Sequence, residues 1–349
     1  MEDEITYEDL KYQKFNESLD VDGAIDVAGY NFFPSFILFK TDKDLFVQAY
    51  FEFVERDYED LKDTIYNQYP SCIAYNFRLS EKGEGASDPV RKLLHLKDTW
   101  EAIIFVLYAL VLGEVRSKSI NISSAQVFVS FGADGLPVYG NFNNARLITS
   151  ALKTKIQCIK AIINFSKSNN LNLKCEVIEE ELLDKLLELQ DIRNDISHHT
   201  APTREEAEEE LRLVIPLFQE MLVFTTFLED CKILRFESFA AKCKCEEFKG
   251  HHLNKEFEDF DFEGNVGLVL SFGQEQLFVK WDEELFSLSP FLHFHKDDIG
   301  RETYISFFKE RKEEKHRFEP ITKRHDFTYD HLQVRFDTEQ AHLQSLIIP

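Results

Sequence analysis

The sequence predicts an α+β protein with a central antiparallel four-helix bundle, a small mixed N-terminal region and a β-rich C-terminal domain. Apolar residues recur at helical spacing in four long segments between about residues 87 and 235. From about residue 236 they alternate with polar residues, as in half-buried strands. The segment SEKGEGASDP (80–89) is rich in Gly and Ser, which indicates a boundary before the helices. We therefore expect a mixed region over 1–84, the bundle over 87–235 and the β-rich domain over 236–349.

Two segments define the N-terminal region. YNFFPSFILFK (30–40) is aromatic and apolar around a proline, which predicts a strand and a turn. The segment 42–69 carries Leu45, Phe53 and Leu61 among other apolar residues at helical spacing, which predicts a helix.

Capping signals indicate where two of the four bundle helices begin. Asp88 followed by Pro89 is typical of a helix start. Thr203 and Glu206 form a capping box, in which each side chain can bond the other residue's backbone amide. The first helix therefore starts near residue 87, and a loop is expected at 130–142. The other helices are expected at about 143–167, 177–197 and 203–234.

The C-terminal domain is expected to contain several short strands. Residues 265–281, NVGLVLSF-GQ-EQLFVKW, read as two strands around a Gly-Gln turn, which predicts a hairpin. Further β-type runs occupy 284–294 and 303–309. The mixed charge run KERKEEKHR (309–317) is more typical of a solvated helix or loop. Lys323 and Arg324 follow it in the most basic part of the chain and are weak candidates for RNA contact.

Composition limits the classes of partner. The 349 residues carry a net charge of −23, which repels nucleic acid and anionic membranes at long range. Any RNA contact must then be local, or completed by a partner. The longest apolar run (102–112) is shorter than the roughly 20 residues of a membrane span, so we expect no membrane contact. The acidic N-terminus and six scattered cysteines predict a cytoplasmic protein with reduced thiols.

The segment LQDIRNDISHHTAP (189–202) places chemically versatile side chains at the end of the third helix. The simplest interpretation is a solvated helix end, where Arg and His favour the helix dipole. The alternative is a catalytic site for RNA cleavage, which needs a base for the 2′-hydroxyl, an acid for the 5′-oxygen and a cation for the phosphate. Histidine supplies the first two, and arginine binds phosphate through two parallel hydrogen bonds. The candidate residues are Arg193, Asn194, Asp195, His198 and His199.

Geometry favours a dimer for such a site. Asn194 and His198 are four residues apart and share a helix face. Arg193 and His198 are five apart, which places them about 140° apart around the axis. One copy supplies a single Arg193 and a single His198, so two copies with these helix ends together would complete the site.

The stretch Arg193 to His198 resembles the RNxxxH form of the motif found in HEPN domains (higher eukaryotes and prokaryotes nucleotide-binding). The resemblance covers about residues 87–235. It implies a metal-independent endoribonuclease, with no cofactor, that dimerises through the bundle and acts as a toxin-like effector in bacterial antiviral defence, abortive infection or stress response. By position, Arg193 and His198 would be the catalytic pair and Asn194 would orient the histidine or the phosphate. Asp195 and His199 are auxiliary candidates without a firm role. The substrate would be an RNA, with tRNA as one candidate, and a regulatory or sensor protein could be a partner.

Two other interpretations stay open, and two local features are not expected to form sites. Some HEPN domains are inactive, so the chain could be a non-catalytic scaffold that dimerises and bridges other proteins. A weaker alternative is a partner of a nucleotidyltransferase. CKCEEFKGHH (243–252) holds two Cys and two His, but this spacing suits structural zinc poorly, so we expect no metal there. The glutamates of TREEAEEEL, next to the motif, are more typical of a solvated helix start than of a binding site.

Overall fold

The computed structural model describes residues 15–16, 24–27, 30–32, 41–197, 202–252, 256–296, 303–322 and 326–348. The chain divides into two compact units, Met1–Thr64 and Ile65–Pro349. Both expected domain boundaries, near 84–87 and near 235, fall within the second unit. Helices and strands are both abundant, so the expected α+β class is confirmed.

The first unit holds a small antiparallel sheet in the order β1-β2-β3. Helix α3 (Lys43–Gln68) begins here, and the Asp42 carboxylate accepts a hydrogen bond from the Leu45 amide near its start at 3.1 Å. The helix expected at 42–69 is thus confirmed. The expected strand is present at β3, and residues 33–40 lie outside the described part. The strands are β1 (Phe15–Asn16), β2 (Ala24–Val27) and β3 (Tyr30–Phe32).

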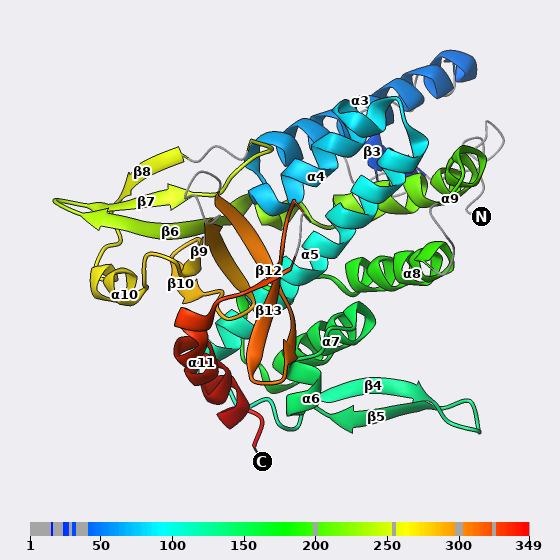
Figure 1. The fold of residues 1–349 in the computed structure, drawn as a ribbon. Helices are drawn as coiled ribbons and strands as arrows, with labels where there is room; N and C mark the ends of the chain where they lie inside the picture. Colours follow the sequence, from blue (N-terminus) through cyan, green and yellow to red (C-terminus); the bar gives the residue numbers. More distant parts are fainter. Residues whose placement is uncertain are drawn as a thin grey trace. The chain divides into compact units, whose positions relative to one another are not determined.

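Helix α5 (Pro89–Ser117) runs through the middle of the second unit (Figure 1). Asp88 caps it by accepting from the amides of Val90 and Arg91, and Pro89 occupies its first turn, as the sequence predicts. Every residue from Thr99 to Val115 is buried, so this stretch packs on all sides. An all-round apolar helix is typical of the centre of a larger fold.

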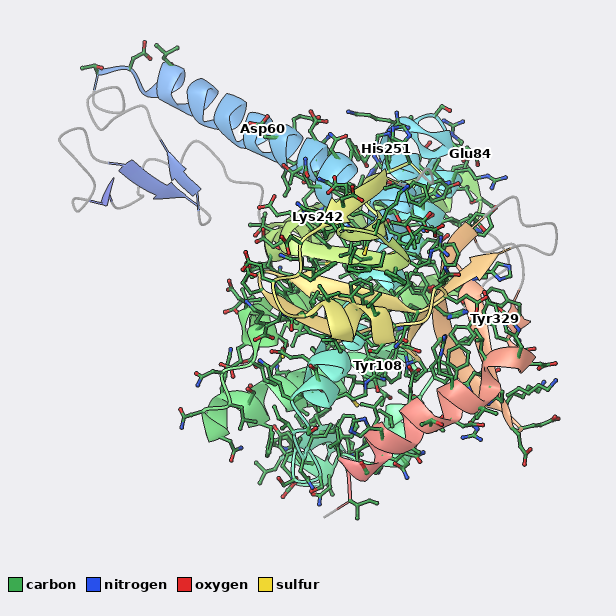
Figure 2. The ribbon with its side chains drawn as sticks, turned by 90° about the vertical axis from the view of Figure 1, so that its left-hand side faces the viewer. Asp60, Glu84, Tyr108, Lys242, His251 and Tyr329 are labelled. Carbon is green, nitrogen blue, oxygen red and sulfur yellow. The ribbon has the colours of Figure 1, made fainter. Side chains whose placement is uncertain are left out.

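Helices α4, α7 and α9 pack against α5, and α8 packs in turn against α7 and α9. The Trp100 indole donates to the Leu186 carbonyl of α8 at 3.2 Å. The hydroxyl of Tyr108, labelled in Figure 2, donates to the Leu147 carbonyl of α6 at 2.9 Å. The helices are α4 (Ser71–Lys82), α6 (Asn144–Leu147), α7 (Leu152–Asn169), α8 (Glu180–Ser197) and α9 (Arg204–Val223).

Three antiparallel sheets complete the second unit. A five-stranded sheet has the order β10-β9-β6-β7-β8, a four-stranded sheet has β11-β12-β13-β14, and β4 pairs with β5. The C-terminal region is therefore β-rich, as expected, and α11 (Gln333–Ser345) follows it. The strands are β4 (Gln126–Phe131), β5 (Pro137–Asn141), β6 (Cys231–Phe239), β7 (Cys243–Glu247), β8 (Glu256–Phe260), β9 (Leu277–Trp281), β10 (Glu284–Ser287), β11 (Leu292–Lys296), β12 (Thr303–Lys312), β13 (Lys315–Pro320) and β14 (Phe327–Thr328).

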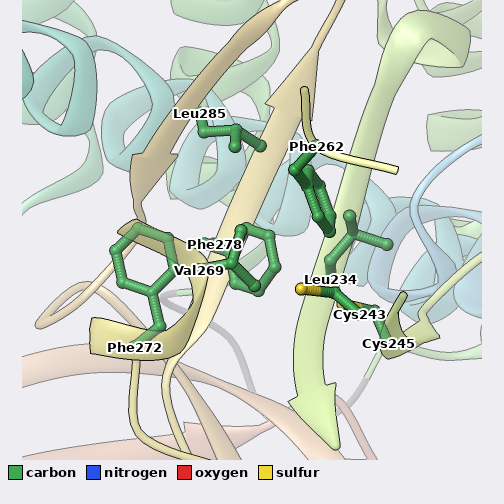
Figure 3. Packing of buried hydrophobic residues seen from close by; sticks show 8 residues of the cluster. All are labelled: Leu234, Cys243, Cys245, Phe262, Val269, Phe272, Phe278 and Leu285. Atoms are coloured by element: carbon green, nitrogen blue, oxygen red, sulfur yellow. The ribbon is translucent and has the colours of Figure 1, made fainter. Parts of the chain in front are cut away.

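The hairpin expected at 265–281 is wrong. Its first half forms a short helix, α10 (Val266–Ser271), and only its second half is a strand, β9. Val269 and Phe272 pack in a buried cluster over the five-stranded sheet, together with Phe278 of β9 (Figure 3). Strand β9 pairs with β6 and β10, so neither of its edges is left for residues 265–271.

Four other local expectations need correction. The fourth bundle helix ends at Val223, not near residue 234, because residues 231–239 pair as β6 with β7 and β9. The charge run 309–317 forms the β12–β13 hairpin, and the expected loop at 130–142 contributes to the β4–β5 hairpin. The second expected helix is divided into α6 and α7. The segment 80–89 packs closely: a Cβ on buried Gly85 would lie 2.6 Å from the Ser80 carbonyl oxygen.

Candidate functional site

The C-terminal end of α8 carries the first three residues of the expected catalytic motif. Arg193, Asn194 and Asp195 lie within this helix, whose described residues end at Ser197. His198 and His199 lie outside the described residues, as do Lys323 and Arg324. The structure therefore describes the backbone of the first part of the motif. That the Arg193 and His198 side chains lie close together stays a prediction.

Packing on both sides holds α8 in position. Leu182, Leu186 and Leu189 are buried, as their helical spacing predicts. On the α7 side, the Lys160 ammonium lies 3.0 Å from the Asp184 carboxylate. On the α9 side, Lys185 of α8 pairs with Glu220. These contacts anchor the helix that leads into the motif.

A narrow apolar pocket of about 40 Å³ lies where α8 meets α5 and α9. Ile192, next to Arg193 in the chain, lines it on one side of the motif, and Pro202 lines it on the other. Trp100 and Phe218 form part of the wall. Among the described residues that line it, Lys97 alone is charged, so this part of the pocket can anchor the segment through apolar contact but offers little to a phosphate.

The start of α9 gives the neighbourhood a negative charge. The predicted capping box is present: Thr203 Oγ1 accepts from the Glu206 amide at 3.3 Å, and the Glu206 carboxylate accepts from the Thr203 amide at 2.7 Å. Glu205, Glu208 and Glu209 are exposed, in agreement with a solvated helix start. RNA that reaches the end of α8 from this side would meet like charge.

The cysteines and histidines of residues 243–252 do not converge. Cys243 and Cys245 of β7 point into the apolar core (Figure 3), and burial raises the pKa of Cys245 to about 12. His251 (Figure 2) bonds the Tyr66 carbonyl through Nδ1 at 2.9 Å. Within the described ranges, no three His, Cys, Asp or Glu side chains form a group that could hold a metal ion. All six cysteines are buried and free of disulfides, which makes them poor nucleophiles.

A second candidate site was not predicted from the sequence. A polar cleft lies between α5, the start of α7 and the β12–β13 hairpin, and His95 and Lys309 are among its lining residues. The sequence holds part of the signal, because Arg91, His95 and Asp98 recur at helical spacing in the first half of α5. The hairpin residues opposite them are about two hundred positions away, and no local pattern connects the two segments.

No family model, curated protein or solved structure matches this chain. Among the residues that the structure describes, no helix combines the length and the apolar character that crossing a membrane requires.

Proposed function

We propose that this protein is a metal-independent endoribonuclease that cleaves RNA by attack of a 2′-hydroxyl at a composite site in a dimer. The observation that carries the proposal is the placement of Arg193 and Asn194 at the end of α8. That helix is anchored on both sides, and its described residues end at Ser197, one residue before His198.

The neighbourhood of the four helices supports a HEPN-like bundle. Each of α5 and α8 packs against both α7 and α9, which is the contact pattern of four helices around a common axis. We propose that two copies associate through this bundle so that their α8 ends lie together.

In the proposed mechanism His198 acts as the base for the 2′-hydroxyl, and His198 of the second copy acts as the acid for the leaving 5′-oxygen. Arg193 stabilises the charge that builds up on the phosphate, and Asn194 orients the histidine or the phosphate. The products are a 2′,3′-cyclic phosphate and a 5′-hydroxyl. By the same resemblance, we propose a toxin-like role in bacterial antiviral defence or stress response, in the cytoplasm.

The proposal is tested by incubating total RNA and tRNA with the purified protein in EDTA, followed by end-group analysis. The wild type is expected to leave 2′,3′-cyclic phosphates, and Arg193→Ala and His198→Ala are each expected to lower the rate at least about 100-fold. Arg204→Ala, at the exposed start of α9, serves as the matched control that keeps activity. Cleavage that survives both motif substitutions would show that the site lies elsewhere.

A non-catalytic scaffold is the second candidate, and the β4–β5 hairpin favours it. Phe131, Leu136 and Tyr139 are 69%, 64% and 54% exposed. Asp134 is the only charged residue between Lys118 and Arg146. An exposed apolar arm with a single charged residue is typical of a protein–protein contact. This function predicts a dimer by light scattering together with RNA that stays intact in the cleavage assay.

A further inference from the structure

The polar cleft beside α5 has the size of a small-molecule site. Its volume is about 550 Å³, within the range of roughly 300–1,000 Å³ that ligand pockets occupy. Helix α5 forms one wall, residues Ser150 and Leu152 at the start of α7 a second, and the β12–β13 hairpin a third. Three rigid elements therefore border it.

A polar stripe on α5 faces this cleft. Arg91, His95, Asp98 and Glu101 follow one another at intervals of three or four residues and all line the cleft. The same helix is buried on every side from Thr99 onward. Charged side chains on such a helix are costly unless they meet a polar partner.

Two polar groups at the cleft lack such a partner. Both ring nitrogens of His95 and the Thr322 hydroxyl are buried, and none of these three atoms has a hydrogen-bond partner among the described residues. Burial also lowers the pKa of His95, so at neutral pH its ring offers one donor and one acceptor. A buried polar atom of this kind needs a hydrogen bond from a ligand or from water.

The charges in the cleft are ordered by depth. Carboxylates lie deeper: the Glu101 and Glu319 side chains are 10% and 21% exposed. Cations lie nearer the rim: the Arg91 and Lys309 side chains are 57% and 39% exposed. The ion pairs Lys97–Glu101 at 3.8 Å and Lys309–Glu319 at 3.6 Å are longer than the roughly 2.8 Å of a charge-assisted hydrogen bond. Lys309 also lies 3.3 Å from the Asp326 carboxylate. A carboxylate or an ammonium group has several hydrogen-bonding positions, so these side chains can bond a ligand in addition to their protein partners.

We propose that this cleft binds a sugar phosphate. The sugar hydroxyls donate to the Glu101 and Glu319 carboxylates and also bond His95 and Thr322. The phosphate lies at the rim, where Arg91, Lys97 and Lys309 supply the positive charge. This site shares no proposed catalytic residue with the ribonuclease site and does not depend on it.

Isothermal calorimetry with the full-length protein tests the proposal. Ribose 5-phosphate is the probe, with ribose and inorganic phosphate as its two halves. Ribose 5-phosphate is expected to bind at least about tenfold more tightly than either half, because only it engages both the deep carboxylates and the rim cations. Lys309→Ala and Arg91→Ala are expected to weaken binding about tenfold each, since each removes one phosphate partner.

Lys315→Ala is the matched control, since Lys315 lies on the same hairpin, is exposed and pairs with Asp330 away from the cleft. His95→Ala should also weaken binding, but both exposed cation variants are informative even if this one fails to fold. Adenosine 5′-monophosphate distinguishes two kinds of ligand that both contain a sugar phosphate. If it binds more tightly than ribose 5-phosphate, the natural ligand is a nucleotide, and if it binds more weakly, the ligand is a free sugar phosphate. Absent binding, equal binding of inorganic phosphate, or affinity unchanged in both cation variants would overturn the proposal.

Discussion

Lys155 of α7 is a fully buried lysine whose ammonium group has no carboxylate partner among the interactions that the structure shows. Its Nζ donates to the Thr149 carbonyl at 2.7 Å and lies 4.5 and 5.4 Å from the ring centres of Tyr108 and Phe105. One hydrogen bond and aromatic faces replace only part of the lost hydration. Burial therefore lowers the pKa of Lys155 from 10.5 to about 7.

The lowered pKa of Lys155 predicts that the stability of the protein depends on pH. Below about pH 7 both the folded and the unfolded chain carry the proton, so the full cost of burial is present. As the pH rises from about 7 toward 10.5, the folded protein releases the proton first, and the free energy of unfolding rises by up to about 1.4 kcal/mol per unit. Lys155→Met is expected to raise stability at pH 7 by a few kcal/mol and to remove this slope.

Urea denaturation between pH 7 and 8.5 measures both effects. Lys153→Met removes a positive charge from an exposed position on the same turn and should keep the wild-type slope. A Lys155→Met variant that keeps the slope would show that another group causes it.

At the scale of the element, the close approach of α5 to β10 depends on a glycine. A Cβ on Gly113 would lie 2.7 Å from the Ser287 carbonyl oxygen and 2.9 Å from the Phe286 ring. On the next turn Arg116 donates to the carbonyl oxygens of Ser287 and Ser289 at 3.1 and 2.6 Å. The helix is therefore held against the chain at the end of β10 through backbone atoms, which cannot move aside as a flexible side chain can.

Gly113→Ala is therefore expected to destabilise the protein by about 1–3 kcal/mol, although alanine is the better helix former. Gly267→Ala in α10 is the matched control, because a Cβ there meets no atom within 4 Å. That substitution should be neutral or stabilise by up to about 1 kcal/mol. Thermal unfolding measures the change in stability of both variants. Equal changes would show that helix propensity, and not the contact with Ser287, determines the effect of the Gly113 substitution.

At the scale of the whole molecule, the net negative charge opposes both the dimerisation and the RNA binding that the proposed composite site requires. A net charge of −23 makes two copies repel each other and the RNA, and the exposed glutamates of α9 lie in the sequence directly after the motif. Association must then come from apolar contact, for which the bundle and the β4–β5 hairpin are the available surfaces. We expect cleavage to be faster at moderate than at low salt, because salt screens this repulsion.

Mixing the wild type with an inactive variant tests whether the proposed site is composite. If the site takes its base from His198 of one copy and its acid from His198 of the other, only dimers of two wild-type copies cleave RNA, so an equal mixture with His198→Ala should keep roughly a quarter of the cleavage of the same total amount of wild type. A site within one copy would keep roughly half. The two proteins must be mixed under conditions that allow subunits to exchange, which a labelled wild-type copy can verify.

The sequence alone determined the features that depend on neighbouring residues. Asp88 with Pro89 and Thr203 with Glu206 start their helices as predicted, and the described residues of α8 lie within the helix expected at about 177–197. Caps and apolar periodicity act over a few residues, so they can be read from one segment. The end of α8, which carries half of the proposed catalytic site, was predictable for this reason.

Only the tertiary structure decided which segments became strands and which residues met across the fold. Residues 266–271 are an apolar run typical of a strand but form a helix, because β6 and β10 already flank β9 and Val269 packs into the core over the sheet. The charged residues 309–317 form strands because β11 and β14 pair with that hairpin. The cleft joins His95 to Lys309 and Thr322. Strand pairing and cleft formation depend on contacts between distant segments, which local propensity does not encode.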